Sequence, residues 1–398
     1  MKGNNSVRFV FRMEILSKYS LVTFEILNEM YVAIGTGVLG ILYLLKKGFH
    51  RYDTIRTLTI VSITTVSVAY VNKRNRKQLQ ANKTKVVCIT GCDSGLGFSL
   101  AQHTVDMGFT VIAGFLSLES KGCKDIRQKY GKNIIQIQLD ITDTNSVRAA
   151  VQTIEHFLTR NSGYSLHAII NNAGIMVFGE FEWLTENLIH QQVELNLMGT
   201  LRFTNAFCPL LRLHQGRVIT VTSHCAQAAL PGIAVYGATK AALSAFNDGF
   251  RTEMSKYGVK VIQFIPGSFT LQSNIMAKQL QYVQEMHDNF TPEQHAFYSD
   301  YFKAYNIYLS FLTPPPSPIK IDDPKLYVEY EKTLLDEHPC IVYKNENWRY
   351  WFYHNLFKFS PWFLRDYFVL KFMSMPNYVP SDTNISSDSY DGSDDLVL

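Results

Sequence analysis

Four side chains between residues 196 and 240 have the types and spacing needed for proton transfer at an alcohol. Tyr236 and Lys240 lie four residues apart in YGATKAAL, so they would share one face of a helix. The pKa of a free tyrosine is about 10, and a neighbouring ammonium together with another nearby cation would lower it. Ser223, thirteen residues upstream, could donate to a substrate oxygen, and Asn196 could anchor a water beside Lys240. The pattern therefore predicts acid–base chemistry.

The same Y-x-x-x-K spacing occurs twice more, and about one chance occurrence is expected in a chain of this length. Tyr43 and Lys47 lie where an apolar run meets a basic segment, so the lysine is interpreted as an interfacial anchor. Tyr367 and Lys371 lie in an aromatic stretch with no serine-bearing run thirteen residues before them. The surroundings, and not the spacing, favour the pair at 236 and 240.

A glycine-rich turn follows the first apolar run of the central part of the chain. The segment TGCDSGLG places Gly91, Gly95 and Gly97 between a strand-like run and a helix-like run. Glycines at such a turn let backbone amides approach a pyrophosphate at the start of the helix. The glycines alone are weak evidence, and their position favours a dinucleotide site.

Polar residues at the ends of two later runs fit the rest of a dinucleotide. Asp140 follows IIQIQL and could accept a hydrogen bond from an adenine amino group. Asn171 and Asn172 end another run, just before Ala173 and Gly174, and could bond across neighbouring strands to hold the floor of the site. Each of these residues, taken singly, also fits a loop cap.

The residue that usually selects between NAD and NADP is missing. The second apolar run ends in AGFL at 113–116, with no acid for the adenosine ribose and no Arg or Lys for a 2′-phosphate. Asp93, in the glycine turn, would repel a 2′-phosphate if it lay close. We therefore expect NAD(H) in preference to NADP(H).

Apolar runs alternate with helix-length segments through the central part of the chain. This alternation is typical of a parallel sheet with helices on both faces. We therefore expect the α/β class, with a Rossmann-type doubly wound parallel sheet. The predicted strands are KVVCIT, FTVIAGF, IIQIQLD, HAIINNAG, RVITVTS and KVIQFIPG.

Together these motifs resemble the short-chain dehydrogenase/reductase family. T-G-x-x-x-G-x-G, N-N-A-G, an Asn, a Ser and Y-x-x-x-K occur in the family's order over residues 85–270. The resemblance implies that Tyr236 is the base in oxidation and the acid in reduction, and that Lys240 tunes it and binds the ribose. It also implies that Ser223 holds the substrate oxygen and that Asn196 completes a proton relay.

The resemblance further implies a set of cofactor contacts. Pro266 and Gly267 match the family's PG turn beside the nicotinamide, and Thr270 is expected to contact the carboxamide. The expected cofactor site comprises Gly91, Asp93, Ser94, Gly95, Leu96, Gly97, Asp140, Asn172, Ala173, Gly174, Tyr236, Lys240, Pro266, Gly267 and Thr270.

Within the family, three stretches resemble the branch that contains 3-hydroxybutyrate dehydrogenase, 17β-hydroxysteroid dehydrogenase type 2 and the retinol dehydrogenases. They are GCDSGLGFSLA, NNAGIMVFGEFEW and WRYWFYHNLFKFSPWF. We expect a lipophilic primary or secondary alcohol, steroid- or retinoid-like, as substrate. A small hydroxy acid such as 3-hydroxybutyrate is the alternative, and it would need a basic partner such as Lys278. An alternative of another class is a nucleotide-binding scaffold without turnover.

The first 84 residues are expected to form a membrane-anchor region. Two uncharged runs, about 30–45 and 57–71, are each flanked by Lys or Arg. A buried helix followed by a buried strand is the alternative. Both flanks are basic, so charge does not fix the topology. Both the endoplasmic reticulum and the mitochondrion fit such an anchored protein, and the endoplasmic reticulum is the expected location.

The chain after the central part has a different character. Residues 271–380 are expected to form a helical, aromatic substrate lid and C-terminal extension, and 381–398, with five Asp and no Lys or Arg, a disordered acidic tail. Residues 348–372 fit either a membrane-interface helix or a cover for the sheet edge. The aromatics expected to line a lipophilic pocket, or to pack as core, are Phe290, Phe297, Tyr298, Tyr301, Phe302, Tyr305, Tyr308 and Phe311.

Composition disfavours two other classes. The net charge is only +4 and the basic residues form no patch interleaved with stacking aromatics, so no nucleic-acid partner is expected. None of the six cysteines forms a C-x-x-C pair, so no metal site is expected and a reducing compartment fits. The family resemblance makes a homo-oligomer the expected assembly.

Overall fold

The structure is a computed structural model, and it describes residues 58–59, 62, 65–66, 77–228, 230–269, 272–311, 318–373, 375–376 and 378. The first predicted anchor run and the acidic tail lie outside these residues, and the second anchor run lies mostly outside them. Within the described part of the chain, no helix combines the length and the apolar character needed to cross a membrane.

The chain divides into two compact units, which are described separately. One comprises 1–80 and 335–340, and the other comprises 81–334 and 341–398. In the smaller unit, Gln78 forms an antiparallel bridge with Asp336. The larger unit contains the sheet and all of the motifs described above for the central part.

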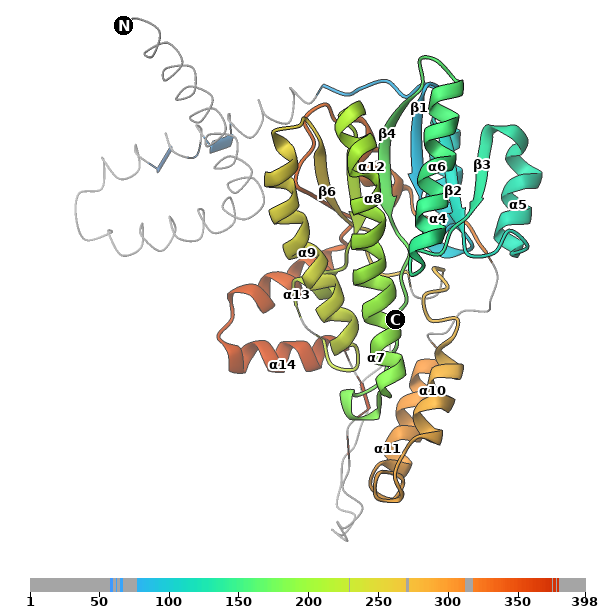
Figure 1. Ribbon diagram of the computed structural model, residues 1–398. Coiled ribbons are helices and arrows are strands. Elements are labelled where there is room, and N and C mark those ends of the chain that lie inside the picture. The colour runs from blue at the N-terminus through green and yellow to red at the C-terminus, as the bar shows by residue number, and fades with distance from the viewer. Residues whose placement is uncertain are drawn as a thin grey trace, which may run out of the picture. The chain divides into compact units, whose positions relative to one another are not determined.

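A seven-stranded parallel sheet with the order β3-β2-β1-β4-β5-β6-β7 forms the centre of the larger unit (Figure 1). The expected doubly wound α/β fold is therefore confirmed. The seventh strand was not predicted, because three residues are too few to show an apolar run. The strands are β1 (Lys85–Ile89), β2 (Thr110–Phe115), β3 (Ile134–Gln138), β4 (Ser165–Asn171), β5 (Arg217–Val221), β6 (Lys260–Ile265) and β7 (Val342–Lys344).

The inner strands are apolar because both faces of the sheet are covered. Every residue of β5 is buried, as is every residue of β1 and β2 after the first. Chain order reverses between β1 and β4, and such a reversal opens a crevice at the carboxyl ends of the strands. The fold therefore places the glycine turn, which follows β1, beside the residues that follow β4 and β5.

Helices pack on both faces of the sheet. On one face, apolar side chains of three helices share a core cluster with the strands, and Figure 1 shows these helices side by side: α6 (Thr144–Arg160), α8 (Thr200–His214) and α9 (Ala234–Ser255). On the other face, the Thr104 hydroxyl lies 2.5 Å from the Tyr330 hydroxyl and the Tyr330 ring contacts Phe264 of β6. That face carries α4 (Gly95–Asp106), α5 (Lys121–Tyr130) and α12 (Pro324–Leu335).

A second cluster holds the C-terminal helices around Trp183. The Trp183 ring lies 5.0–5.6 Å from four aromatic rings of one helix: Tyr298, Tyr301, Phe302 and Tyr305. The hydroxyls of Tyr298 and Tyr301 also donate to the carboxylates of Glu182 and Glu180. The helices of this region are α7 (Glu186–Val193), α10 (Gln279–Asp288), α11 (Pro292–Ser310), α13 (Trp348–Phe359) and α14 (Trp362–Met373).

Two positions in the turn after β1 require glycine because the backbone there lies very close to the residues that follow β4. Gly91 has φ +69°, and a Cβ there would lie 2.9 Å from Cα of Ala173. A Cβ on Gly97 would collide with the carbonyl of Gly91 and with the amide of Asn172. The turn and the first residues of α4 are thus packed against the end of β4.

We predict that Gly97→Ala lowers the free energy of unfolding by about 1–3 kcal/mol, because backbone must shift to admit the methyl group. The matched control is Gly249→Ala in α9, where an added Cβ would meet no atom within 4 Å and alanine favours the helix by up to ~1 kcal/mol. Urea unfolding followed by circular dichroism measures both. Equal stability of the two variants would contradict the packing described.

Candidate active site

A cavity of about 790 Å³ lies at the carboxyl ends of the strands in the larger unit. It brings together most of the residues expected to bind a cofactor with three of the four expected to be catalytic. Gly95 and Asn196 do not line it, and Thr270 lies outside the described residues. The expected residues that line it are Gly91, Asp93, Ser94, Leu96, Gly97, Asp140, Asn172, Ala173, Gly174, Ser223, Tyr236, Lys240, Pro266 and Gly267.

Asn172 and Thr90 tie the glycine turn to the end of β4. The Asn172 side-chain amide donates to the carbonyls of Thr90 (2.9 Å) and Gly91 (3.2 Å). The Thr90 hydroxyl in turn accepts from the backbone amides of Asn172 and Ala173, both at 3.0 Å. The neighbouring Asn171 donates to Thr204 of α8. The two asparagines therefore bond across neighbouring elements, as expected for the floor of the site.

Asp93 turns toward the end of β2. One of its carboxylate oxygens accepts from the amide of Leu116 at 2.9 Å, and the other from the amide of Ser117 at 3.4 Å. Sequence reasoning found no acid at the end of β2, and the structure places this acid there from the glycine turn. A carboxylate at this position lies where an adenosine ribose would bind in a fold of this type.

Asp140 and Gly267 have local structural partners as well as positions on the cavity wall. Asp140 accepts from the amide of Thr142 at 2.8 Å and from its hydroxyl at 2.7 Å, so the loop-cap interpretation also describes it. Gly267 has φ +102°, and a Cβ there would lie 2.9 Å from the carbonyl of Asn345. The loop after β6 is therefore packed against the chain that follows β7.

Tyr236 and Lys240 lie on the buried face of α9. Residues of this helix are buried at intervals of three or four, and the two side chains belong to that stripe. The Lys240 ammonium donates to the carbonyl of Val221, the last residue of β5, at 3.0 Å. It lies 5.7 Å from the centre of the Tyr236 ring. Ser223 begins the short helical turn after β5, where its hydroxyl accepts from the amide of Cys225.

Burial shifts the pKa of both helix residues against ionisation. It raises the pKa of the Tyr236 phenol well above its ordinary value; the nearby Cys225 thiol adds to this rise, and a hydrogen bond with Ser223 opposes it. It lowers the pKa of the Lys240 ammonium from 10.5 to about 8, and Cys225 opposes that shift. Burial therefore outweighs the Ser223 hydrogen bond, and the pKa of Tyr236 lies above its ordinary value in this structure.

Asn196 is buried behind the loop that follows β4. Its side chain accepts from the amide of Ile175 and donates to the Ile175 carbonyl, both at 2.8 Å, and donates to Thr239 at 3.3 Å. It lies in a π-helical turn (Glu194–Gly199), a feature often found at functional sites. The side chain thus fixes the loop against α9 and makes these contacts instead of lining the cavity.

The other Y-x-x-x-K pairs have different surroundings. The Tyr367 side chain in α14 is 59% exposed, so it is not in a buried site. Tyr43 and Lys47 lie outside the described residues.

A cluster that sequence reasoning missed lies next to Ser223. His224 Nδ1 and His354 Nδ1 lie 3.2 and 3.6 Å from the same carboxylate oxygen of Glu346. The donor atoms lie within 4.8 Å of one another, close enough to suggest a metal site. However, the two imidazole rings are stacked at 15° with centres 4.4 Å apart, and a shared ion would have to lie in both ring planes. We interpret the cluster as contacts that hold α13 against the turn after β5.

Burial shifts the pKa of His224 and the pKa of Glu346 in opposite directions. It lowers the pKa of His224, although the contact with Glu346 opposes the shift. Burial would raise the pKa of Glu346, but His224, His354 and Lys344 outweigh it and hold the pKa of that carboxyl below its usual range. Glu346, which follows β7, and His354 of α13 lie more than a hundred residues after His224 in the chain, so no local sequence pattern could reveal this cluster.

The rest of the cavity wall is largely apolar. Of the eight aromatics proposed from the sequence to line it, Tyr308 does so, while Tyr298, Phe302 and Tyr305 pack around Trp183 and Phe297 and Phe311 are exposed. Seven of the eight therefore do not line the cavity, and the alternative of core packing describes those that contact Trp183, which include Tyr301. The apolar wall is formed by Met176, Phe178, Leu230, Ile233, Leu309, Phe372, Met373 and Met375.

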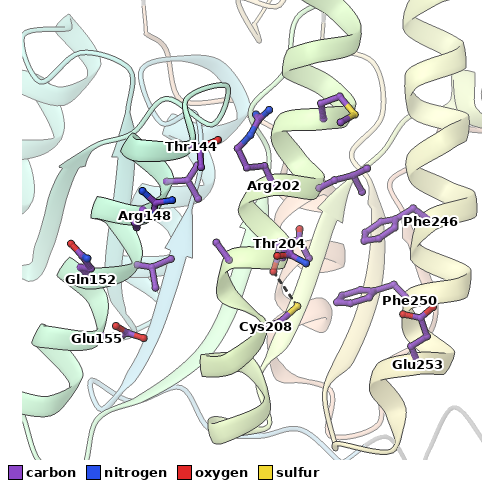
Figure 2. A pocket seen from close by; sticks show the side chains of 16 residues that line it. Thr144, Arg148, Gln152, Glu155, Arg202, Thr204, Cys208, Phe246, Phe250 and Glu253 are labelled. Atoms are coloured by element: carbon purple, nitrogen blue, oxygen red, sulfur yellow. Dashed lines mark hydrogen bonds between the residues drawn. The ribbon is translucent and has the colours of Figure 1, made fainter.

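A second hollow of about 780 Å³ lies between α6, α8 and α9. Figure 2 shows Phe246 and Phe250 of α9 on one side of it and Arg148 and Glu155 of α6 on the other. None of the residues expected to bind cofactor or act in catalysis lines it. The motif residues therefore assign the chemistry to the first cavity.

Comparisons with known proteins identify the family of the chain. The sequence matches the short chain dehydrogenase family over residues 85–281. Mitochondrial D-beta-hydroxybutyrate dehydrogenase of Mus musculus is 37% identical over 204 residues, which cover 51% of this chain and 59% of that protein. The chain thus matches less than two thirds of the length of that relative.

Two other relatives match over more of their length. Estradiol 17-beta-dehydrogenase 2 of Mus musculus is 31% identical over 267 residues, covering 66% of this chain and 68% of that protein. Retinol dehydrogenase 7 of Rattus norvegicus is 30% identical over 297 residues, covering 74% and 90%. With its parallel sheet, glycine turn and buried Tyr-Lys pair, the chain belongs to the short-chain dehydrogenase family.

Proposed function

We propose that the protein is a membrane-anchored, NAD-dependent oxidoreductase that interconverts a lipophilic, steroid- or retinoid-like alcohol and its carbonyl compound. The observation that carries the proposal is the arrangement of Ser223, Tyr236 and Lys240 in one cavity, which the glycine turn and a largely apolar wall also border. The relatives named for estradiol, retinol and hydroxybutyrate support an alcohol as substrate.

Each polar side chain of the site has a role that follows from its position. In oxidation, the Tyr236 oxygen accepts the proton of the substrate hydroxyl, and in reduction it returns a proton to the carbonyl oxygen. Ser223 donates to the same substrate oxygen. Lys240, fixed to the Val221 carbonyl, keeps a positive charge near the phenol and favours its ionised form. Asn196 fixes the loop beside this pair and, by family resemblance, completes the proton relay.

The glycine turn fits a dinucleotide. The turn has no room for a side chain at Gly97, and the N-cap residue of α4 makes no side-chain cap bond, so the first amides of the helix are available to a pyrophosphate. A nicotinamide, when bound, accepts or supplies the hydride. The residues that would hold the dinucleotide are those of the turn with Asp140, Ala173, Gly174, Pro266, Gly267 and Thr270.

Asp93 supports NAD over NADP. Its carboxylate lies at the end of β2, where it can accept from a ribose hydroxyl and would repel a 2′-phosphate. No Lys or Arg among the described residues that line the cavity lies in the glycine turn or just after β2.

A small hydroxy acid is the second candidate substrate, and one observation favours it. The Arg349 side chain lines the cavity, although its guanidinium also donates to the Phe372 carbonyl at 3.3 Å and lies 5.3 Å from the Phe372 ring centre. It offers a partner for a carboxylate. Lys278, considered from the sequence, does not line the cavity. The apolar wall is more extensive than the Arg349 contact and favours the lipophilic alcohol.

The location and assembly of the protein are part of the same proposal. The uncharged runs 30–45 and 57–71 support anchoring through the N-terminal region, with the endoplasmic reticulum favoured over the mitochondrion. A homo-oligomer is proposed from the family resemblance.

Replacing Tyr236 with Phe should remove the proton acceptor and keep the shape of the site. We predict that Tyr236→Phe lowers kcat for NAD-linked oxidation by about 10²–10⁴-fold while NADH affinity stays nearly unchanged. Tyr367→Phe, a change to the exposed tyrosine of another Y-x-x-x-K pair, is the matched control and should keep full activity. Unchanged turnover in Tyr236→Phe would show that another group moves the proton.

The role of Asp93 predicts a change in cofactor preference. Asp93→Asn should raise kcat/KM with NADP relative to NAD by about tenfold, because the repulsion of the 2′-phosphate is removed. Asp248→Asn, on the exposed side of α9, should leave the ratio unchanged. The ratio is measured by following NADH and NADPH absorbance under the same conditions. A ratio that is equal in both variants would contradict this placement of Asp93.

A further inference from the structure

Helices α13 and α14 form a hairpin that exposes many large apolar side chains. Trp348 is 80% exposed, Trp362 76% and Leu370 65%. In Figure 1 the turn between the two helices points away from the sheet. The exposed residues used below are Trp348, Trp351, Phe359, Trp362, Phe363 and Leu370.

Few residues of the hairpin are fully buried. Phe357 is the one buried residue of α13, and Val369 is the one buried residue of α14. A surface helix of a water-soluble protein normally confines its apolar residues to the stripe that faces the core. Here apolar residues lie on the outer sides too, and an exposed patch of this kind marks an interaction surface.

The charges between the exposed aromatics select the kind of partner. Residues 348–373 contain Arg349, Lys358, Arg365 and Lys371, and Asp366 is the one acid. Tryptophan and tyrosine mixed with Lys and Arg are typical of helices that lie in the interface of an anionic bilayer. Protein–protein interfaces are depleted in lysine, so the composition favours lipid over a protein partner.

The tip of the hairpin has the same character. Phe359, Trp362 and Phe363 flank the Ser360–Pro361 turn, and all three are exposed. Turns that face water are usually built from small and polar residues. An apolar tip is suited to entering the boundary between headgroups and acyl chains.

The inner side of the hairpin belongs to the cavity. Arg349, Tyr350 and His354 of α13 and Phe372 and Met373 of α14 line it. The same two helices therefore carry the exposed patch and one wall of the candidate active site.

We propose that the α13–α14 hairpin docks on an anionic lipid bilayer, so that the cavity opens toward the membrane from which a lipophilic substrate would enter. The docking itself is inferred only from the exposed residues and charges of the hairpin. The entry of substrate from the membrane rests on the proposed function. The N-terminal region would hold the chain at the membrane, whereas the hairpin would set the position of the cavity against it.

The tryptophans of the protein report on this contact. Three of the four, Trp348, Trp351 and Trp362, lie in the hairpin, and the fourth, Trp183, is 2% exposed. The full chain is reconstituted in vesicles of phosphatidylcholine and phosphatidylserine, with and without brominated phosphatidylcholine, a short-range quencher of indole fluorescence. We expect fluorescence to fall by about half or more in brominated vesicles. A variant with all three hairpin tryptophans changed to Phe should lose this quenching.

A matched pair of double variants tests the patch itself. Trp362→Ser with Leu370→Ser removes two exposed residues of the hairpin, and Leu213→Ser with Leu280→Ser removes two of similar exposure, 73% and 67%, from α8 and α10. The first should reduce quenching of the remaining hairpin tryptophans at least about twofold, and the second should not. Replacing phosphatidylserine by phosphatidylcholine should also reduce it.

Equal wild-type fluorescence in brominated and plain vesicles would overturn docking. If light scattering then also shows a dimer that the Trp362/Leu370 variant loses, the patch joins two copies of the chain instead. Neither measurement uses substrate or cofactor, so failure of the dehydrogenase proposal would leave this test intact.

Discussion

The hydrogen bond from the Lys240 ammonium to the Val221 carbonyl is the contact on which the site depends. It joins the N-terminal third of α9, on the buried face of the helix, to the last residue of β5. It thereby fixes Tyr236, one turn earlier on the helix, relative to Ser223, which lies two residues beyond the strand. The ammonium is almost completely buried, which lowers its pKa to about 8 and leaves its charge sensitive to neighbouring groups. Strand order, helix placement and the apolar core serve to bring these elements to one edge of the sheet.

The nucleotide side is built by backbone packing and the substrate side by long-range contacts. Thr90 and Asn172 lock the glycine turn to the end of β4, and the absence of side chains at Gly91 and Gly97 permits that approach. The substrate side is closed by segments more than a hundred residues downstream, where one carboxylate oxygen of Glu346 contacts the imidazoles of both His224 and His354.

The sequence was sufficient where a feature is local and insufficient where it depends on the fold. Six strands show as apolar runs, and the glycine turn shows as a spacing, but the three residues of β7 carry too little pattern. The sequence shows that no acid follows β2. Only the structure shows that the Asp93 carboxylate, from the glycine turn, lies at that position. The sequence shows the aromatic residues of α11 but not whether they line the cavity or pack in the core. Tyr298, Phe302 and Tyr305 pack on Trp183, which lies about 115 residues earlier in the chain, and they do not line the cavity.

In the proposed reaction the buried tyrosine meets a lipophilic alcohol in a largely apolar cavity. The most direct test is NAD-linked turnover by the full chain in lipid vesicles, with estradiol, retinol and 3-hydroxybutyrate compared as substrates. We expect saturable turnover and the highest kcat/KM with estradiol or retinol. Saturable turnover with 3-hydroxybutyrate alone would contradict the proposal and would assign the Arg349 side of the cavity to a carboxylate.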